Sequence, residues 1–502
     1  MYLGFQSIEE LEDALRTQPE SFWLERGEKR ALELFHAAAE RVPAYKDFLA
    51  KNTIDHTKIQ TMPDFKSVPT VDKNNYIGAY SREQLCWDGK FKESQWTISA
   101  TSGSTGEPFY FPRNNTQILQ YALTAELFLR SNFDVANKST LYIIGFPMGV
   151  WIGGVFSYQA VHTVVGRSKC PLSIITPGIN KAEILKAVQN LGKEFDQIII
   201  GSYGPFLKDV VDDGLNKGVN WNDYKLGVIF AAEGFSEEFR DYIVEKMGLA
   251  NEYKDTLNIY GTVDLGTMAH ETPLSVLIRR LAVNNKDLFS ELFGDIFKLP
   301  TLTQFIPEMF YFEDVGDDLI CTADSGYPLV RYDLKDHGGV IKLEDVKKKV
   351  TASGVDLKDV CAKGNINSTL WNLPFVHVYE RSDFSVSFFA FQVYPETVRK
   401  AIQDPSIAES ITGKFTMMVK YDEQKNQYLE INVELKQNIT ETDLIKELVR
   451  DLVMNRLLQE SSEYRKTTEE FPGKTIPKIV FWPYEDPTYF RPGTKQKWVS
   501  KG

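Results

Sequence analysis

LGVIFAAEGFSEEFRDYIVEKMGLANEYKDTLNIYGTVD, residues 226–264, predicts a strand, a helix and a second strand. The runs 226–234 and 257–264 are short and apolar, whereas 236–248 has the pattern of an amphipathic helix with Ser236 as its N-cap. Strands that are apolar on both faces and alternate with helices are typical of a parallel sheet. The segment therefore predicts a β–α–β unit.

The same alternation extends towards the N-terminus. Three more strands are predicted at 139–147, 172–178 and 195–205, and three more helices at 115–132, after a capping Asn114, at 181–192 and at 205–218. Ligands of such sheets bind beyond the carboxyl ends of the strands. We expect a binding site where SYGP (202–205), AAEG (231–234) and YGTVD (260–264) fall.

Beyond about residue 300 the pattern changes. Residues 303–344 predict a meander of antiparallel strands, and the last part of the chain predicts a smaller α+β module. The expected fold class is α/β, with mostly parallel sheets plus an antiparallel meander in a large N-terminal domain, 1–379. A small C-terminal lid domain, 380–502, follows.

Composition excludes several classes of protein. The 502 residues carry a net charge of −12 without a long basic run, which argues against nucleic acid as a partner. No apolar run is long enough to span a bilayer, and the acidic N-terminus lacks a signal-peptide pattern. We expect a cytoplasmic protein whose four cysteines, well separated in sequence, are free thiols.

The stretch TSGSTGEP, 101–108, lies between two predicted strands. It is not a Walker loop, because it lacks the lysine and Phe109 follows the proline. Glycines and hydroxyls still suit phosphate, since they offer neutral donors in a concave backbone. An ordinary polar hairpin turn is the alternative. The candidate phosphate ligands are Thr101, Ser102, Gly103, Ser104, Thr105 and Gly106.

Several motifs, in a fixed order, resemble those of the adenylate-forming superfamily of acyl-CoA ligases, with phenylacetate–CoA ligase as the most similar branch. The matching stretches are TSGSTGEP (101–108), FPMGVWIGG (146–154), AAEGFSEEFR (231–240), IYGTVD (259–264), PLVRYDLKD (328–336), ERSD (380–383) and GTKQKWV (493–499). The resemblance covers most of the chain. It implies activation of a carboxylic acid by ATP.

The resemblance also implies roles for individual residues. The backbone of Ala232 and Glu233 would face adenine, and Tyr260 would stack on it, followed by Gly261 and Thr262. Asp336 would bind the ribose hydroxyls, for which a carboxylate is well suited. The remaining roles are Arg381 in nucleotide binding, Asp264 as the Mg²⁺ ligand, Asp383 as the hinge and Lys495 as the catalytic lysine.

The glycine- and aromatic-rich segment 146–154, which we call the acid segment, implies the pocket for the acid. Its expected members are Phe146, Trp151, Gly153, Gly154 and, from another strand, Tyr203. Aromatic side chains with glycines make a flat apolar slot, which suits an aryl or medium-length acid. Core packing would explain the same aromatic residues.

The expected reaction uses ATP, Mg²⁺ and coenzyme A, with a small carboxylic acid as substrate. Two alternatives remain open: transfer of the acyl or adenylyl group to a carrier protein, a protein thiol or an amine, and a catalytically weakened nucleotide-binding homologue. Val263 and Asp264, which depart from the family's hydroxyl residue and glutamate, keep the second alternative open. Thr494, inserted in the tail motif, makes Lys497 the alternative to Lys495.

Overall fold

The computed structural model describes residues 2–101, 109–294, 299–381, 385–490 and 499, and only the backbone of Glu380, Arg381 and Glu396. The chain divides into two compact units. One comprises Met1–Ser99 and Tyr110–Tyr379, and the other Ala100–Phe109 and Glu380–Gly502.

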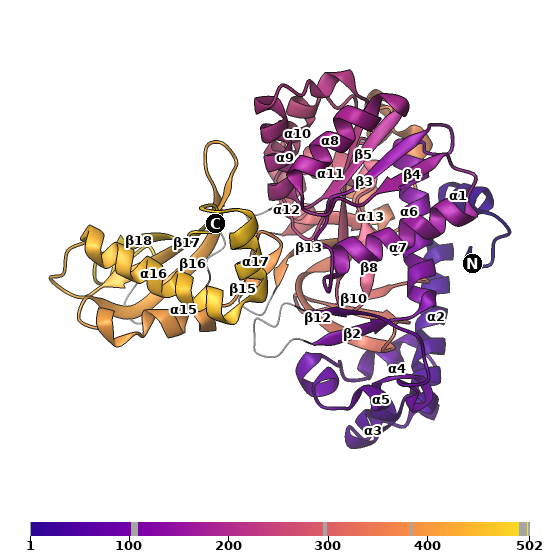
Figure 1. Cartoon of the computed structure of the whole chain (residues 1–502). Helices are drawn as coiled ribbons and strands as arrows, with labels where there is room; N and C mark the ends of the chain where they lie inside the picture. Colours follow the sequence, from indigo (N-terminus) through magenta and orange to yellow (C-terminus); the bar gives the residue numbers. More distant parts are fainter. Residues whose placement is uncertain (1, 102–108, 295–298, 382–384, 491–498, 500–502) are drawn as a thin grey trace. The chain divides into compact units, whose positions relative to one another are not determined.

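In the described residues, the first unit contains an eleven-stranded sheet with the order β10-β11-β12-β13-β9-β8-β7-β6-β5-β3-β4 (Figure 1). Five strands are parallel: β3 (Thr140–Ile144), β4 (Leu172–Ile175), β5 (Gln197–Ser202), β6 (Leu226–Ala231) and β7 (Thr256–Thr262). The other six are β8 (Gly266–His270), β9 (Thr301–Gln304), β10 (Tyr311–Val315), β11 (Asp318–Ala323), β12 (Leu329–Ile341) and β13 (Phe375–Arg381). The predicted fold class, with parallel strands followed by an antiparallel meander, is confirmed.

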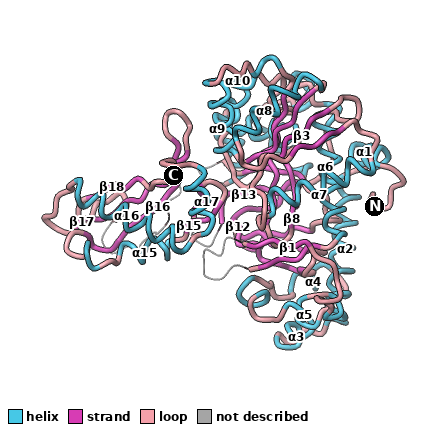
Figure 2. The backbone as a smooth tube through the Cα atoms, viewed as in Figure 1, coloured by secondary structure: helices cyan, strands magenta, loops and turns pink. Residues whose placement is uncertain are grey.

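Helices alternate with the parallel strands along the chain (Figure 2). The first unit's described helices are α1 (Ile8–Thr17), α2 (Glu20–Arg41), α3 (Pro43–Lys51), α4 (Met62–Ser67), α5 (Arg82–Leu85), α6 (Asn115–Phe133), α7 (Ile152–Arg167), α8 (Lys181–Leu191), α9 (Gly204–Asn216), α10 (Glu237–Met247), α11 (Pro273–Val283), α12 (Lys286–Phe293), α13 (Leu343–Ala352) and α14 (Leu357–Lys363). The residues of β3 and β5 are all buried, as strands covered on both faces should be.

Two predicted helix starts are confirmed by their capping bonds. Ser236 accepts a hydrogen bond from the amide of Phe239 at 3.3 Å, and Asn114 accepts one from the amide of Gln117 at 3.0 Å. Each bond satisfies an amide that has no partner within its own helix. These caps begin α10 and α6.

The meander strands join the same sheet as the parallel strands. β10 pairs antiparallel with β11, and β11 with β12, in which the register shifts near Cys321. Strand β7 pairs antiparallel with β8, so the direction of the sheet changes after β7. A separate hairpin joins β1 (Thr97–Ala100) to β2 (Tyr110–Arg113) around the glycine-rich loop.

The second unit contains a hairpin and a three-stranded sheet with helices. Its described elements are β14 (Val386–Phe388), β15 (Phe391–Val393), α15 (Pro395–Ile402), β16 (Ile411–Tyr421), β17 (Gln427–Leu435), α16 (Asp443–Glu460), α17 (Ser462–Glu470) and β18 (Lys478–Trp482). Strand β18 pairs parallel with β17. In the sequence, Thr440 with Asp443 three residues later resembles a capping box and predicts the start of α16. This prediction is wrong, because Thr442 accepts the capping bond from the amide of Ile445.

All four cysteines are buried and unbridged, as expected. Among the described helices, none combines the length and the apolar character that crossing a membrane requires.

Candidate functional site

Strands β7 and β12 contribute the central polar residues of the candidate site. Tyr260 lies near the end of β7, Asp264 follows in the turn to β8, and Tyr332 and Asp336 lie in β12. The hydroxyl of Tyr260 donates to Oδ2 of Asp336 at 2.6 Å, and the hydroxyl of Tyr332 donates to Oδ2 of Asp264 at 2.6 Å. The four side chains therefore form two crossed Tyr–Asp pairs.

The crossed pairs arise from equal spacing in two distant segments. Tyr260-Gly-Thr-Val-Asp264 and Tyr332-Asp-Leu-Lys-Asp336 both place an aspartate four residues after a tyrosine. All four residues are less than 10% exposed. Hydrogen bonds to carboxylates are strong and short, so each tyrosine orients the other segment's acid. The structure thus brings together the predicted adenine residue and the predicted ribose residue.

A lysine from the N-terminal region reaches the same aspartate. Nζ of Lys73 lies 3.2 Å from Oδ2 of Asp264. Lys73 begins the π-helical turn Lys73–Ile77, which is capped by Asp72. Val71, two residues before Lys73, pairs with β12. The amide of Val71 donates to the carbonyl of Arg331 at 3.1 Å, and the carbonyl of Val71 accepts from the amide of Asp333 at 2.8 Å.

Sequence reasoning missed Tyr332 and Lys73. The repeated Tyr-x-x-x-Asp spacing could have indicated Tyr332, since it lies within a motif already singled out. Lys73 stands in a polar run, VPTVDKNN, whose local pattern indicates only a loop. Its place beside Asp264 depends on the pairing of Val71 with a strand about 260 residues away in sequence, which no local pattern reveals.

Asp264 fits a magnesium ion only together with phosphate oxygens. Both its contacts involve Oδ2, and Oδ1 has no hydrogen-bond partner in the described part of the chain. Among the described residues, no cluster of three or more His, Cys, Asp or Glu side chains could hold a metal ion. Mg²⁺ bound through one carboxylate, waters and substrate phosphates is common in nucleotide sites, so this donor set is compatible with it.

The loop after β6 is the predicted adenine segment, and two side chains hold it. Nδ2 of Asn258 donates to the carbonyl of Glu233 at 2.9 Å, and Nη2 of Arg279 donates to the carbonyl of Phe235 at 2.6 Å. Ala232 has a φ of 76°, a conformation that costs a residue with a Cβ atom free energy. The backbone of this loop is therefore held in one unusual conformation.

A buried charge cluster lies beneath this loop: Glu237, Arg240, Glu271 and Arg279. Glu271 accepts from Nη2 of Arg240 at 2.8 Å, from Nη1 of Arg279 at 2.6 Å and from the amide of Asn258 at 2.9 Å. Burial alone would raise the pKa of Glu237, but Arg240 and Arg279 outweigh it, and the pKa lies below its usual value. The cluster connects α10, α11 and β7 behind the site.

Two other predicted residues shape the end of β7. Thr262 accepts a hydrogen bond from the amide of Leu265 at 3.2 Å, which closes the turn that carries Asp264. A Cβ atom on Gly261 would lie 2.5 Å from the carbonyl oxygen of Gly266. Glycine is therefore required for β7 and β8 to approach this closely.

The predicted acid segment leads into α7. Phe146 is buried, Gly153 lies against its ring, and Trp151 precedes the first residue of the helix. A Cβ atom on Gly154 would lie 2.5 Å from the carbonyl oxygen of Pro147, so this turn needs glycine. Tyr203, at the start of α9, is buried and stacks on Phe206 with ring centroids 5.7 Å apart.

Several predicted residues lie outside the described part of the chain: Ser102, Gly103, Ser104, Thr105, Gly106, Asp383, Lys495, the alternative Lys497 and the side chain of Arg381. Thr101 is described. Its amide donates to the carbonyl of Phe109 at 2.9 Å, and its Oγ1 accepts from the amide of Phe109 at 3.0 Å. These bonds close the base of the glycine-rich loop.

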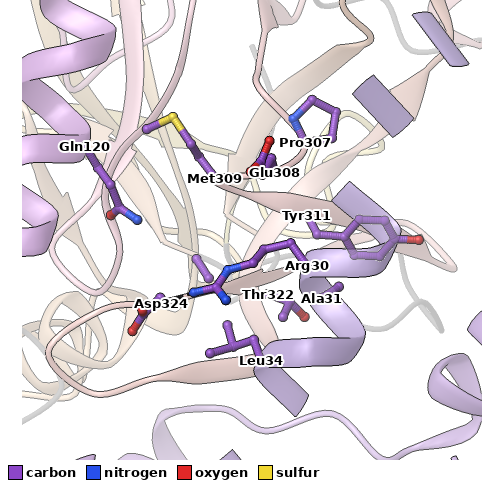
Figure 3. Close-up of a pocket in the computed structure, with 11 residues that line it drawn as sticks. Arg30, Ala31, Leu34, Gln120, Pro307, Glu308, Met309, Tyr311, Thr322 and Asp324 are labelled. Carbon is purple, nitrogen blue, oxygen red and sulfur yellow. Dashed lines mark hydrogen bonds and ion pairs between the residues drawn. The ribbon is translucent and has the colours of Figure 1, made fainter. Parts of the chain in front are cut away.

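Figure 3 shows a different pocket, between α2 and the meander. Nη2 of Arg30 lies 3.5 Å from Oδ2 of Asp324, whose Oδ1 accepts from Nε1 of Trp87 at 3.4 Å. None of the predicted nucleotide or acid residues lines it. The candidate site is therefore the group around Asp264 and Asp336.

No protein-family model and no curated protein matches the sequence. Solved structures of 2-hydroxyisobutyryl-CoA ligase do match. The complex with 2-HIB-AMP and CoA in the thioesterification state has a TM-score of 0.65 at 12% identity and covers 97% of this chain and 91% of that one. An open conformation of the same enzyme has a TM-score of 0.55 at 12% identity and covers 98% and 94%. The likeness shows that this chain has the fold of adenylate-forming ligases.

Proposed function

We propose that the protein activates a carboxylic acid with ATP, forming an acyl adenylate and pyrophosphate, and then transfers the acyl group to coenzyme A. The observation that carries the proposal is the pair of crossed Tyr–Asp contacts, Tyr260–Asp336 and Tyr332–Asp264. The order of the motifs and the likeness to 2-hydroxyisobutyryl-CoA ligase support it. We place the protein in the phenylacetate–CoA ligase-like branch and in the cytoplasm.

In the first step, a carboxylate oxygen attacks the α-phosphorus, and the bond to the leaving pyrophosphate breaks. Asp336 would accept hydrogen bonds from the ribose hydroxyls, with its own orientation set by Tyr260. Tyr260 would also present its ring to adenine. The loop at Ala232 and Glu233, which Asn258 holds through the carbonyl of Glu233, would lie along the base. Thr101 and the five loop residues that follow it would donate to the phosphates.

Two negatively charged groups must approach each other, so positive charge is needed at the reacting centre. Lys73 is a cation beside Asp264, and we propose Lys495 as a second one. Asp264 would hold Mg²⁺ through Oδ1, and the ion would neutralise charge on the phosphates. In the second step the thiol of coenzyme A attacks the acyl carbon and AMP leaves. We propose that the hinge for this step is at Asp383 and that Arg381 binds the nucleotide.

Pyrophosphate exchange tests the proposal. Labelled pyrophosphate should enter ATP only when Mg²⁺ and a suitable carboxylic acid are both present, and aryl or arylacetic acids are the first candidates. Exchange without any acid dependence, or none with a broad panel while ATP binds, would favour a nucleotide-binding protein. Release of AMP with a carrier protein or an amine, and not with coenzyme A, would change the acceptor.

Two lysine variants test the assignment of the catalytic cation. Lys495→Ala should lower acyl-adenylate formation by about a hundredfold, since one oriented charge at a transition state contributes about that much. Conversion of supplied acyl adenylate to the thioester should continue. Lys497→Ala is the matched control, and a loss there with full activity in Lys495→Ala would exchange the two roles.

A further inference from the structure

Arg113, the last residue of β2, is a buried cation that has no anionic partner in the part of the chain that the structure describes. Arg113 is 1% exposed. Nη2 donates to Oγ of Ser99, and the guanidinium carbon lies 4.9 Å from the centroid of the Phe156 ring. Nε and Nη1 are buried and have no hydrogen-bond partner in the described part of the chain. No carboxylate is paired with this arginine in the described residues.

Such an arrangement is costly in a free protein. An uncompensated buried charge costs several kcal/mol, and buried donors nearly always have partners. Burial lowers the pKa of Arg113 to about 10, so the guanidinium keeps its proton at neutral pH. The serine and the aromatic ring together supply one acceptor and a weak electrostatic contact. Nε and Nη1, on different edges of the guanidinium, therefore keep donors that have no partner among the described residues.

The surroundings of Arg113 connect it to the acid segment. Phe156 lies in α7, within one turn of the predicted pocket residues Gly153 and Gly154. A Cβ atom on Gly266 would lie 2.9 Å from Cε1 of Phe156, so the same ring touches the turn that carries Asp264. The ring of Tyr121 also packs on Phe156, with ring centroids 4.8 Å apart. The hydroxyl of Tyr121 lies 3.1 Å from Oγ of Ser157.

We propose that Arg113 recognises a second carboxylate on the acid, so that the preferred substrate is a dicarboxylic acid activated at one end. This rests on the proposed function and specifies its substrate class. A planar carboxylate accepts two parallel N–H···O bonds from one edge of a guanidinium, which a spherical anion cannot, and each edge of Arg113 includes one unpaired donor. The carboxylate that reacts with ATP would lie towards Asp264, and the second one would lie against Arg113, with Phe156 between the two regions.

The experiment compares matched acids in pyrophosphate exchange: phenylacetate against 4-carboxyphenylacetate, and butyrate against succinate. In at least one pair the diacid should have a kcat/KM about a hundredfold or more above its partner, because a site built to pair a polar group rejects the analogue that lacks it. Arg113→Met should remove that preference, and Arg113→Lys, which keeps the charge, should retain part of it. Arg41→Met, which removes an exposed arginine paired with Asp88, is the matched control, with the preference intact.

A binding measurement without nucleotide separates this inference from the proposed function. The diacid should raise the melting temperature of the wild-type protein and of Arg41→Met, and should not raise that of Arg113→Met. Exchange with monocarboxylic acids at rates equal to those of their diacid partners would overturn the inference and leave the function standing. A diacid-dependent rise in melting temperature with no exchange for any acid would support the anion site and overturn the function.

Discussion

The hydroxyl of Tyr332 lies 2.6 Å from the carboxylate of Asp264, although the two residues are 68 positions apart in sequence. The same oxygen, Oδ2, lies 3.2 Å from Nζ of Lys73. Asp264 is therefore held by one neutral donor and one cation, both on the same side of the carboxylate. Its other oxygen, Oδ1, has no hydrogen-bond partner among the described residues, and the geometry of that oxygen depends on Tyr332.

Tyr332→Phe should lower pyrophosphate exchange by about 10- to 100-fold, because a hydrogen bond to a charged group contributes about 1.5–3 kcal/mol. The Mg²⁺ concentration needed for half-maximal exchange should rise, since the aspartate is then oriented by Lys73 alone. A Mg²⁺ titration of exchange measures both effects. Tyr45→Phe is the matched control, because the hydroxyl of Tyr45 is buried without a hydrogen-bond partner among the described residues. An unchanged Mg²⁺ requirement in Tyr332→Phe would contradict the positioning role.

Asp264→Asn should retain the fold and lose Mg²⁺-dependent exchange by about a hundredfold or more, because the charge that would bind the metal is removed. Lys73 loses its ion-pair partner in this variant, but its side chain is 26% exposed and can turn towards water. The melting temperature should therefore fall only slightly. Asp264→Glu lengthens the side chain by one methylene and tests whether the shorter acid is required. Exchange at the wild-type rate in Asp264→Asn would remove this residue from the metal site.

The order and type of the main elements could be predicted from sequence, because the parallel strands are apolar on both faces and the helices have polar caps such as Asn114 and Ser236. The sequence predicts the cap of α16 two residues too early, since Thr440 and Thr442 offer the same hydroxyl and only the backbone conformation distinguishes them. The crossed Tyr–Asp pairs and Lys73 depend on contacts between distant segments. The buried charge of Arg113 could not be predicted either, because burial depends on packing.

Glu271→Gln should destabilise the protein by about 3–5 kcal/mol, because it leaves Arg240 and Arg279 buried with less negative charge around them. Both arginines are fully buried and cannot turn towards water. The free energy of unfolding in urea measures the loss. Lys347→Ala removes an exposed ion pair with Glu344 and is the control, with an expected change below about 1 kcal/mol. Equal stability of the two variants would show that the cluster does not stabilise the fold.

His270 makes stability depend on pH. It lies between the rings of Phe128 and Trp371, neither ring nitrogen has a hydrogen-bond partner in the described residues, and burial lowers its pKa to about 3. The unfolded chain takes up a proton below the ordinary pKa of 6.5, and the folded chain does not. The stabilising contribution is therefore fully present above pH 6.5 and is lost as pH falls towards 3.

His270→Phe should reduce the loss of unfolding free energy between pH 6.5 and 5 by about 1.4 kcal/mol per pH unit, the value for one proton. Urea unfolding at a series of pH values measures the slope. His162→Phe, at an exposed position in α7, is the control and should leave the slope unchanged. A slope in His270→Phe equal to that of wild type would show that this histidine is not buried as a neutral ring.

Variants in the loop at Ala232 test whether the proposed nucleotide and acid sites can be separated. Asn258 holds this loop from β7 through one hydrogen bond to the carbonyl of Glu233, and no hydrogen bond joins it to residues 146–154 in the described part of the chain. Asn258→Ala removes a bond that contributes about 1 kcal/mol, so the KM for ATP should rise about fivefold. The KM for the acid should stay the same, because Phe146 and Gly153 lie on a different segment.

Ala232→Gly tests the same loop from the opposite direction. Alanine at a φ of 76° costs about 1–2 kcal/mol relative to glycine, so glycine relieves strain in the folded state, although it also gives the unfolded chain more freedom. The variant should be at least as stable as wild type in urea, and its KM for ATP should change little because the hydrogen bond from Asn258 remains. If Asn258→Ala raises the KM values for ATP and for the acid equally, the loop is not specific to the nucleotide. If Ala232→Gly raises the KM for ATP as much as Asn258→Ala does, the backbone conformation at Ala232, rather than the hydrogen bond, decides how the base is held.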